Sequence, residues 1–356
     1  MTIAEIILQI EPLDTTYVEQ ARARTAQLAI PPRALGRLHD LAERLCGINR
    51  SLTPESSPKA FLVMAGDHGV VAEGVSAFPQ TVTGEMVKNF LRGGAGINVL
   101  ARSVNADVTV VDMGIIPEIT PPADSHYPLR ICKVARGTGN IARGPAMTRE
   151  QAEQALLAGF QVAGDLFDSG IRLLGTGDMG IGNTTPSAAI GVAITGCAVE
   201  NMVGRGTGLD DASLQKKKQI VQQALNCNRP NPQDGLDVLA KVGGFEIGGI
   251  AGSILAAAYY RRPVVIDGFI STAGALLAYR LCPRVLDYIF AGHCSEESGH
   301  RLMLQYLGLE PLLDLRLRLG EGTGAALAMG IIEGAVRVFR EVLTFAEAGV
   351  TPQQDQ

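Results

Sequence analysis

The side chains best suited to chemistry lie in short glycine-rich segments. One segment, from Gly175 to Pro186, reads GTGDMGIGNTTP and carries Asn183, a residue type that favours a helix N-cap. Glycines just before a helix N-terminus leave backbone N–H groups free to bind an anion, so this segment predicts a phosphate site. It also contains the pattern G-x-G-x-x-G. No strand ending in an acidic residue follows it, which argues against a dinucleotide site.

Two further glycine segments carry charged side chains. The segment from Gly204 to Asp211 precedes three lysines at 216–218, and a lysine placed there could bind a phosphate or simply cover a solvated helix face. The segment from Gly320 to Gly324 places Glu321 among glycines. A carboxylate in a partly dry pocket could serve as a general base. On residue type alone, an acid that interacts with a helix N-terminus is the better interpretation.

Histidines occur in two segments that could suit acid–base chemistry or a metal. Asp67 and His68 follow an apolar run, and a structural hydrogen bond between them explains the pair at least as well as catalysis does. Residues 293–300 contain two histidines, a cysteine and two glutamates. No second cluster supplies a plausible set of zinc ligands, so we expect no metal.

Most of these segments follow short apolar runs that are typical of buried parallel strands. Helical stretches separate most of the runs, which predicts an α/β fold with a parallel sheet. Ligands bind such sheets beyond the carboxyl ends of the strands, where the glycine segments fall. The runs span residues 60–65, 106–111, 130–135, 171–174, 263–266 and 285–291.

The two ends of the chain have helical patterns. Residues 15–28 and 33–45 carry apolar side chains at intervals of three and four, and residues 324–348 suit one or two helices. We therefore predict a helical small domain of residues 1–57 with part of 325–356, and a parallel α/β domain over 58–324. The polar residues 351–356 suit a frayed tail.

Composition narrows the classes of function. The net charge is −5, Trp is absent, and no basic stripe is visible, so nucleic-acid binding is not expected. No apolar run reaches the ~20 residues that span a bilayer, and the apolar N-terminus lacks the basic region of a signal peptide. The six cysteines form no C-x-x-C pair. We expect them to be reduced thiols in a cytoplasmic protein.

Considered together and in order, six segments resemble those of the nicotinate-nucleotide–dimethylbenzimidazole phosphoribosyltransferases. The resemblance runs from about residue 30 to about residue 335. It implies a three-layer, mostly parallel, Rossmann-like sheet with a small helical domain made from the chain ends, and a homodimer with sites near the subunit boundary. It implies no metal and no cofactor. The segments are residues 66–80, 133–141, 180–186, 241–247, 267–271 and 318–327.

The resemblance also implies a reaction in the assembly of the cobalamin nucleotide loop. The 5-phosphoribosyl group of nicotinate mononucleotide passes to 5,6-dimethylbenzimidazole or a similar base, with inversion at the anomeric carbon, to give α-ribazole 5′-phosphate and nicotinate. Glu321 matches the general base. Phe78, Met86 and Leu319 match positions that bind the acceptor base. The positions that bind the nucleotide and its phosphate are matched by Gly177, Asp178, Gly180, Gly182, Asn183, Gly206, Lys217 and Ser295.

Two departures from the family pattern keep alternatives open. Asp178 stands where the family commonly has Glu, and residues 30–36 read IPPRALG where the family commonly has Lys-Pro-x-Gly-Ser-Leu-Gly. The shorter carboxylate is compatible with a relative that binds the nucleotide or a benzimidazole riboside without turnover, although the intact Glu321 argues against it. An NAD-type dehydrogenase is a third interpretation. The missing strand and acid after Pro186 count against it.

Overall fold

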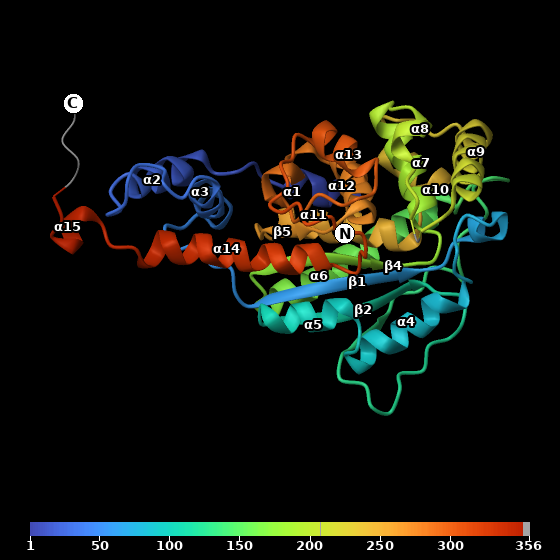
Figure 1. The fold of residues 1–356 in the computed structure, drawn as a ribbon, viewed down its shortest axis with the longest axis horizontal. Helices are drawn as coiled ribbons and strands as arrows, with labels where there is room; N and C mark the ends of the chain where they lie inside the picture. Colours follow the sequence, from blue (N-terminus) through green and yellow to red (C-terminus); the bar gives the residue numbers. More distant parts are fainter. Residues whose placement is uncertain (207, 352–356) are drawn as a thin grey trace.

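The computed structural model describes residues 1–206 and 208–351, and its centre is one parallel sheet (Figure 1). Six strands lie in the order β3-β2-β1-β4-β5-β6, and every neighbouring pair is parallel. The predicted α/β fold is therefore confirmed. The strand order reverses between β1 and β4, where open α/β sheets bind their ligands. The strands are β1 (Lys59–Gly66), β2 (Ala106–Gly114), β3 (Leu129–Ile131), β4 (Leu173–Met179), β5 (Val264–Ile266) and β6 (Ile289–Ala291).

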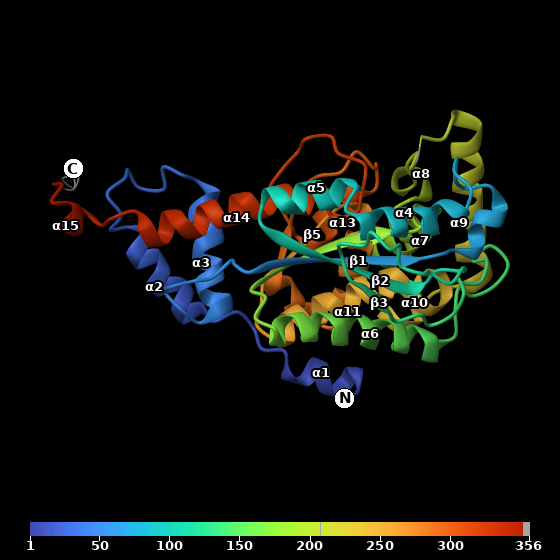
Figure 2. The same ribbon diagram turned by 90° about the horizontal axis from the view of Figure 1, so that it is seen from below.

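Helices cover both faces of the sheet, which explains why β1 is buried along its whole length. Figure 2 shows α5 and α14 on one face and α6 and α11 on the other, which makes three layers. The helices are α1 (Ile3–Gln9), α2 (Thr15–Thr25), α3 (Arg37–Asn49), α4 (Thr81–Arg92), α5 (Gly96–Ser103), α6 (Arg149–Asp168), α7 (Thr184–Thr195), α8 (Val199–Met202), α9 (Asp211–Asn228), α10 (Gly235–Val242), α11 (Phe245–Tyr259), α12 (Phe269–Leu281), α13 (His300–Leu307), α14 (Thr323–Glu341) and α15 (Phe345–Ala348).

Most strands differ in length from the apolar runs that predicted them, and β2, for example, continues to Gly114 where its run ended at residue 111. β4 continues to Met179 instead of ending at residue 174, so Gly175 belongs to a strand and not to a loop. A Cβ on Gly175 would lie 2.1 Å from the ring of Phe61 on the neighbouring strand, so this ring needs a glycine beside it. The edge strands β3 and β6 are shorter than expected. A 3-10 helix (Pro283–Tyr288) replaces the first part of the run at 285–291.

The chain ends come together in a small group of helices beside the sheet. Helices α2 and α3 lie next to the last turns of α14, and Arg24 donates a hydrogen bond from Nε to the carbonyl of Phe339, at 3.3 Å (Figure 1). An isolated bridge joins Leu28 to Thr344. Helix α1 contacts α11 under the sheet instead (Figure 2). The division into a small domain of residues 1–57 with part of 325–356, and an α/β domain of 58–324, stays a prediction.

None of the described helices is long and apolar enough to cross a bilayer. Most of the predicted polar tail, residues 352–356, lies outside the described residues, as does Thr207 in the glycine segment that follows α8.

Candidate active site

The carboxyl ends of the central strands open into a cavity of ≈ 410 Å³. Its lining comes from the residues before and within α4, the loops after β4, β5 and β6, and the loop before α14. The structure thus brings together segments that are far apart in the sequence. The predicted site residues that line it are Phe78, Met86, Asp178, Gly180, Asn183, Gly206, Ser295, Leu319 and Glu321.

Glu321 lies in this cavity in an unusual backbone conformation. Its φ is +64°, and the flanking Gly320 and Gly322 also have positive φ. The side chain is 5% exposed, and its Oε2 accepts a hydrogen bond from the N–H of Ile97 in the first turn of α5, at 3.1 Å. Burial raises the pKa of Glu321, and the hydrogen bond from Ile97 opposes this effect without reversing it. A carboxylate with a raised pKa is a suitable general base.

Apolar side chains border Glu321 on one side of the cavity. Phe78, Met86 and Leu319 all line it, and Phe78 and Leu319 are 50% and 61% exposed. A Cβ on Gly96 would lie 2.9 Å from Leu319 and 3.1 Å from Glu321 Oε2, so these two side chains adjoin at the start of α5. An apolar slot with one polar group suits a flat aromatic ligand.

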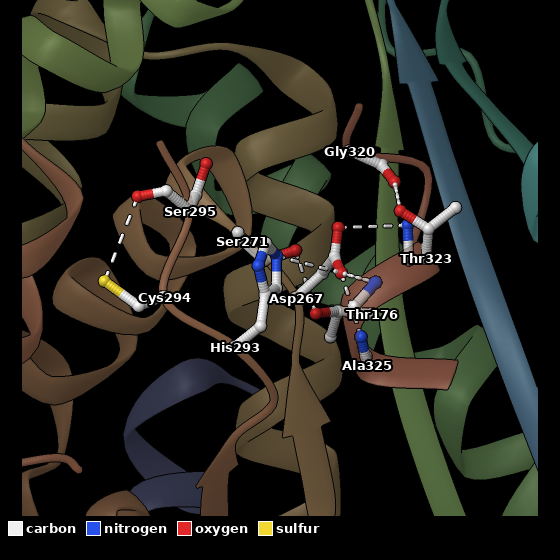
Figure 3. A network of polar contacts seen from close by, with 12 residues as sticks. Thr176, Asp267, Ser271, His293, Cys294, Ser295, Gly320, Thr323 and Ala325 are labelled. Atoms are coloured by element: carbon white, nitrogen blue, oxygen red, sulfur yellow. Dashed lines mark hydrogen bonds and ion pairs between the residues drawn. The ribbon is translucent and has the colours of Figure 1, made fainter. Parts of the chain in front are cut away.

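Asp267 fixes the loop that carries Glu321. Its Oδ2 accepts the N–H of Gly322 at 3.1 Å, and its Oδ1 accepts those of Gly324 and Ala325 at 2.7 and 2.9 Å (Figure 3). These donors belong to the N-terminus of α14, which a carboxylate stabilises. Residue types alone did not assign Asp267 this role. Its place directly after the β5 run was the available signal.

Asp178 lies beside the loop that carries Glu321, because a Cβ on Gly320 would lie 3.3 Å from both of its carboxylate oxygens. Its Oδ2 accepts a hydrogen bond from Asn183 Nδ2 at 2.9 Å, so the Asn183 side chain supports Asp178 instead of capping α7. Burial, and then the nearby Asp267 carboxyl, raise the pKa of Asp178 to about 8. Oδ1 of Asp178 is buried without a hydrogen-bond partner among the described residues. This oxygen therefore keeps an unused capacity to accept a hydrogen bond.

Gly177 and Gly182 lie behind the lining. A Cβ on Gly177 would lie 2.1 Å from the carbonyl oxygen of Glu321, so this glycine lets β4 approach the loop that carries Glu321. Gly182 has a φ of +86°, and a Cβ there would meet Val71 at 2.7 Å. These contacts explain on structural grounds why both positions are glycine. A direct contact of either glycine with a nucleotide remains a prediction.

Lys217 is buried beneath the glycine segment that follows α8. Its Nζ donates hydrogen bonds to Thr184 Oγ1 at 2.7 Å and to the carbonyl of Gly204 at 3.3 Å. A Cβ on Gly206 would lie 3.1 Å from Nζ, so Gly206 separates the ammonium from the cavity. Burial lowers the pKa of Lys217 to about 8. Of the three lysines, Lys217 is thus the one directed toward the candidate phosphate site.

His68 pairs with a residue that sequence reasoning missed. Its Nε2 lies 2.7 Å from Glu246 Oε1, and both side chains are fully buried. Asp67 instead accepts the N–H of Ile116 at 2.8 Å. The expected hydrogen bond between Asp67 and His68 is therefore wrong. Side chains of successive residues in extended chain point in opposite directions, so neighbours in sequence do not meet.

His300 positions Ser295. The Ser295 N–H donates to His300 Nδ1 at 2.8 Å, and His300 Nε2 lies 2.9 Å from Thr272 Oγ1. Because Nδ1 accepts a hydrogen bond, His300 is neutral and donates from Nε2. Burial lowers the pKa of His300 to about 3. Within the described residues, no group of three or more His, Cys, Asp or Glu side chains could hold a metal ion.

Comparison with known proteins places this site in a family. A family model described as "Phosphoribosyltransferase" matches residues 10–350. The nicotinate-nucleotide–dimethylbenzimidazole phosphoribosyltransferase of Geobacter metallireducens is 55% identical over 356 residues, which cover 99% of each chain. The enzyme of the same name from Geotalea uraniireducens is 54% identical over 97% of each chain. The chain belongs to this family.

Solved structures agree with the family assignment. The crystal structure of CobT from Thermus thermophilus aligns with a TM-score of 0.90 and 49% identity, over 95% of this chain and all of that one. A second structure from the same organism, named as the phosphoribosyltransferase, aligns with a TM-score of 0.89 and 48% identity, over 96% of this chain and all of that one. Family membership makes the chain a pentosyltransferase. The NAD-type dehydrogenase is not supported, because Gly175 and Gly177 lie within β4 and not in a turn.

Proposed function

We propose that the chain transfers the 5-phosphoribosyl group of nicotinate mononucleotide to 5,6-dimethylbenzimidazole, for the cobalamin nucleotide loop. The observation that carries the proposal is the position of Glu321, a buried carboxylate with a raised pKa beside an apolar slot. The same cavity is bordered by glycine segments suited to a nucleotide phosphate. Relatives that match along nearly the whole chain are named for this transfer.

The acceptor lies in the slot between Phe78, Met86 and Leu319. Glu321 accepts the proton of one benzimidazole nitrogen while the other nitrogen attacks C1′ of the ribose. The bond from C1′ to the pyridinium nitrogen breaks, and its electron pair leaves with nicotinate. The proton stays on Glu321 until the product departs, so atoms and charge balance without a further reactant. Asp267 keeps the base in place during the transfer through its hydrogen bond from Gly322.

The donor lies across the rest of the cavity. Its phosphate lies at Gly206 and the N-terminus of α7, in front of the buried Lys217 ammonium. The positively charged pyridinium of the donor, bound near Asp178, favours the ionised form of this carboxyl, whose pKa is about 8 in the unliganded chain. Ser295, held by His300, borders the nicotinate ring. Gly180 and Asn183 complete the part of the lining assigned to the nucleotide.

A non-catalytic binding relative is not favoured. Asp178 remains inside the cavity and is supported by Asn183, so the missing methylene does not remove its carboxylate from the site. Glu321 is in place as well. The binding-only alternative therefore has no structural observation in its favour.

We also propose that the chain acts as a homodimer in the cytoplasm. The exposed apolar side chains of Phe78 and Leu319 at the cavity support a surface that another subunit covers. All six cysteines are unpaired thiols, which supports a reducing compartment. Light scattering of the purified protein tests the first part, since a monomer in solution would contradict it.

The direct test is incubation of the pure protein with nicotinate mononucleotide and 5,6-dimethylbenzimidazole, without added metal. Chromatography should show nicotinate and α-ribazole 5′-phosphate formed in equal amounts. Saturable binding of the nucleotide without either product would instead support the binding-only relative.

A further inference from the structure

Glu297 lies where two cavities meet. The cavity that contains Glu321 adjoins a second cavity of ≈ 570 Å³, and Gly206, Glu297 and Arg318 line both. In the sequence, Glu297 belonged to a segment considered as a source of metal ligands, and no second cluster supported that interpretation. The proposed proton transfer does not use it.

The carboxylate of Glu297 is built into the glycine segment that follows α8. A Cβ on Gly204 would lie 2.1 Å from Glu297 Oε2, so the carboxylate occupies the space that a side chain at 204 would need. Its backbone N–H donates to Ser295 Oγ at 3.3 Å, which ties it to a second lining residue. These contacts give the carboxylate a defined place.

Oε2 of Glu297 lacks a donor. The atom is buried and has no hydrogen-bond partner among the described residues. Burial raises the pKa of Glu297, while the charge of Lys217 and the N–H of Gly206 favour its ionised form. Because Glu297 also lines the catalytic cavity, its ionised carboxylate can accept a hydrogen bond from a ligand bound there.

The position of Glu297 indicates which part of the donor it meets. Under the proposed function, C1′ lies beside Glu321 and the 5′-phosphate lies at Gly206. Glu297 contacts Ser295, which borders the nicotinate, and Gly206, which borders the phosphate, so the ribose that joins nicotinate to phosphate passes Glu297. A carboxylate accepts hydrogen bonds and repels a phosphate, whereas the ribose hydroxyls donate hydrogen bonds. Acidic side chains bind ribose hydroxyls in this way in other nucleotide sites.

We propose that Glu297 binds the ribose hydroxyls of the donor and thereby selects ribonucleotides over deoxyribonucleotides. This inference rests on the proposed function, because that function supplies the placement of the donor. Glu297 is then a specificity-determining residue, distinct from the base that takes the proton.

The test compares donors with and without each hydroxyl. Nicotinate mononucleotide and its 2′-deoxy and 3′-deoxy counterparts are supplied to the wild-type chain, to Glu297→Gln and to Glu296→Gln. Calorimetry gives the Kd of each donor without acceptor, and product analysis gives kcat/KM. The Glu296 variant is the matched control, because this exposed neighbour does not line the catalytic cavity.

We expect the wild-type chain to prefer the ribonucleotide over at least one deoxy donor by about 10- to 100-fold, the range for a hydrogen bond to a charged group. Glu297→Gln should lose most of this preference, by weakening the ribonucleotide far more than that deoxy donor. Glu296→Gln should keep the preference.

An equal loss with all three donors would overturn the inference, because a purely structural role affects every donor alike. Tighter binding of all donors to Glu297→Gln would overturn it too, because the carboxylate would then be a competitor of the phosphate. If the wild type turned over no donor but still bound the ribonucleotide more tightly than a deoxy donor, and Glu297→Gln lost that difference, only the proposed function would be contradicted.

Discussion

The Glu321 carboxylate accepts a hydrogen bond from the backbone N–H of Ile97, at 3.1 Å from Oε2. This contact sets the Glu321 carboxylate at the N-terminus of α5, where backbone N–H groups favour its charged form. Burial favours the neutral form and has the larger effect, so the pKa is raised. The carboxylate therefore binds a proton more tightly than an exposed glutamate does, which suits the proposed role of Glu321 as general base.

Replacement of Glu321 by Gln should remove the base and leave the shape of the cavity. We expect kcat to fall by about 10²- to 10⁴-fold, the usual contribution of general base catalysis. Calorimetric binding of nicotinate mononucleotide should stay within about twofold of wild type. Glu341→Gln, at the exposed far end of α14, is the control. Turnover at the wild-type rate in Glu321→Gln would disprove the assignment.

Gly177→Ala should disturb the loop that carries Glu321. The new Cβ would lie 2.1 Å from the backbone oxygen of Glu321, so the loop must shift. We expect a loss of about 1–3 kcal/mol in the free energy of unfolding, as for other overpacked sites, together with a lower kcat. Urea unfolding and initial rates measure both. Gly144→Ala, with no atom within 4 Å of its Cβ, should change neither.

Lys217→Met should weaken donors that carry a phosphate. We expect KM for nicotinate mononucleotide to rise about tenfold or more, because a charged hydrogen-bond donor is lost. Nicotinate riboside, which has no phosphate, should react equally poorly with the variant and the wild type. Lys216→Met, at an exposed neighbour, should behave as wild type. An equal loss with both donors would show that Lys217 acts only through the fold.

Asp178 should make stability depend on pH. Its pKa is about 8 in the folded chain and about 3.9 in an unfolded one, so the folded state holds a proton that the unfolded state releases. The stabilisation by this proton is complete below about pH 4 and is lost as the pH rises through 8. The wild type should therefore lose stability relative to Asp178→Asn between about pH 5 and pH 8.5, by at least about 1.4 kcal/mol.

Urea unfolding of both chains at several pH values measures this difference. Asp107→Asn, at an exposed position in β2, should leave the pH dependence of the wild type unchanged. A constant difference between the wild type and Asp178→Asn across this range would contradict a raised pKa in the folded state.

Short apolar runs in the sequence predicted the parallel sheet, because a strand that is buried on both faces has a continuous apolar sequence. They could not predict which strand-end side chains meet. Glu246 joins His68 across 178 residues of sequence, and Asp267 joins Gly322 across 55. Such pairs depend on strand order, which spacing does not reveal. Glu321 was identified through its resemblance to the family, since the residue types around it favoured a plain helix-terminal acid.

Helix α14 connects the loop that carries Glu321 to the helices formed by the two ends of the chain. It begins two residues after Glu321, continues for 19 residues, or about 28 Å, and ends beside α2 and α3. A helix of this length is stiff, so a change in its direction at one end also moves the residues at its other end. A displacement of the helical group at the chain ends would therefore change the orientation of Glu321, although that group lies at the far end of α14.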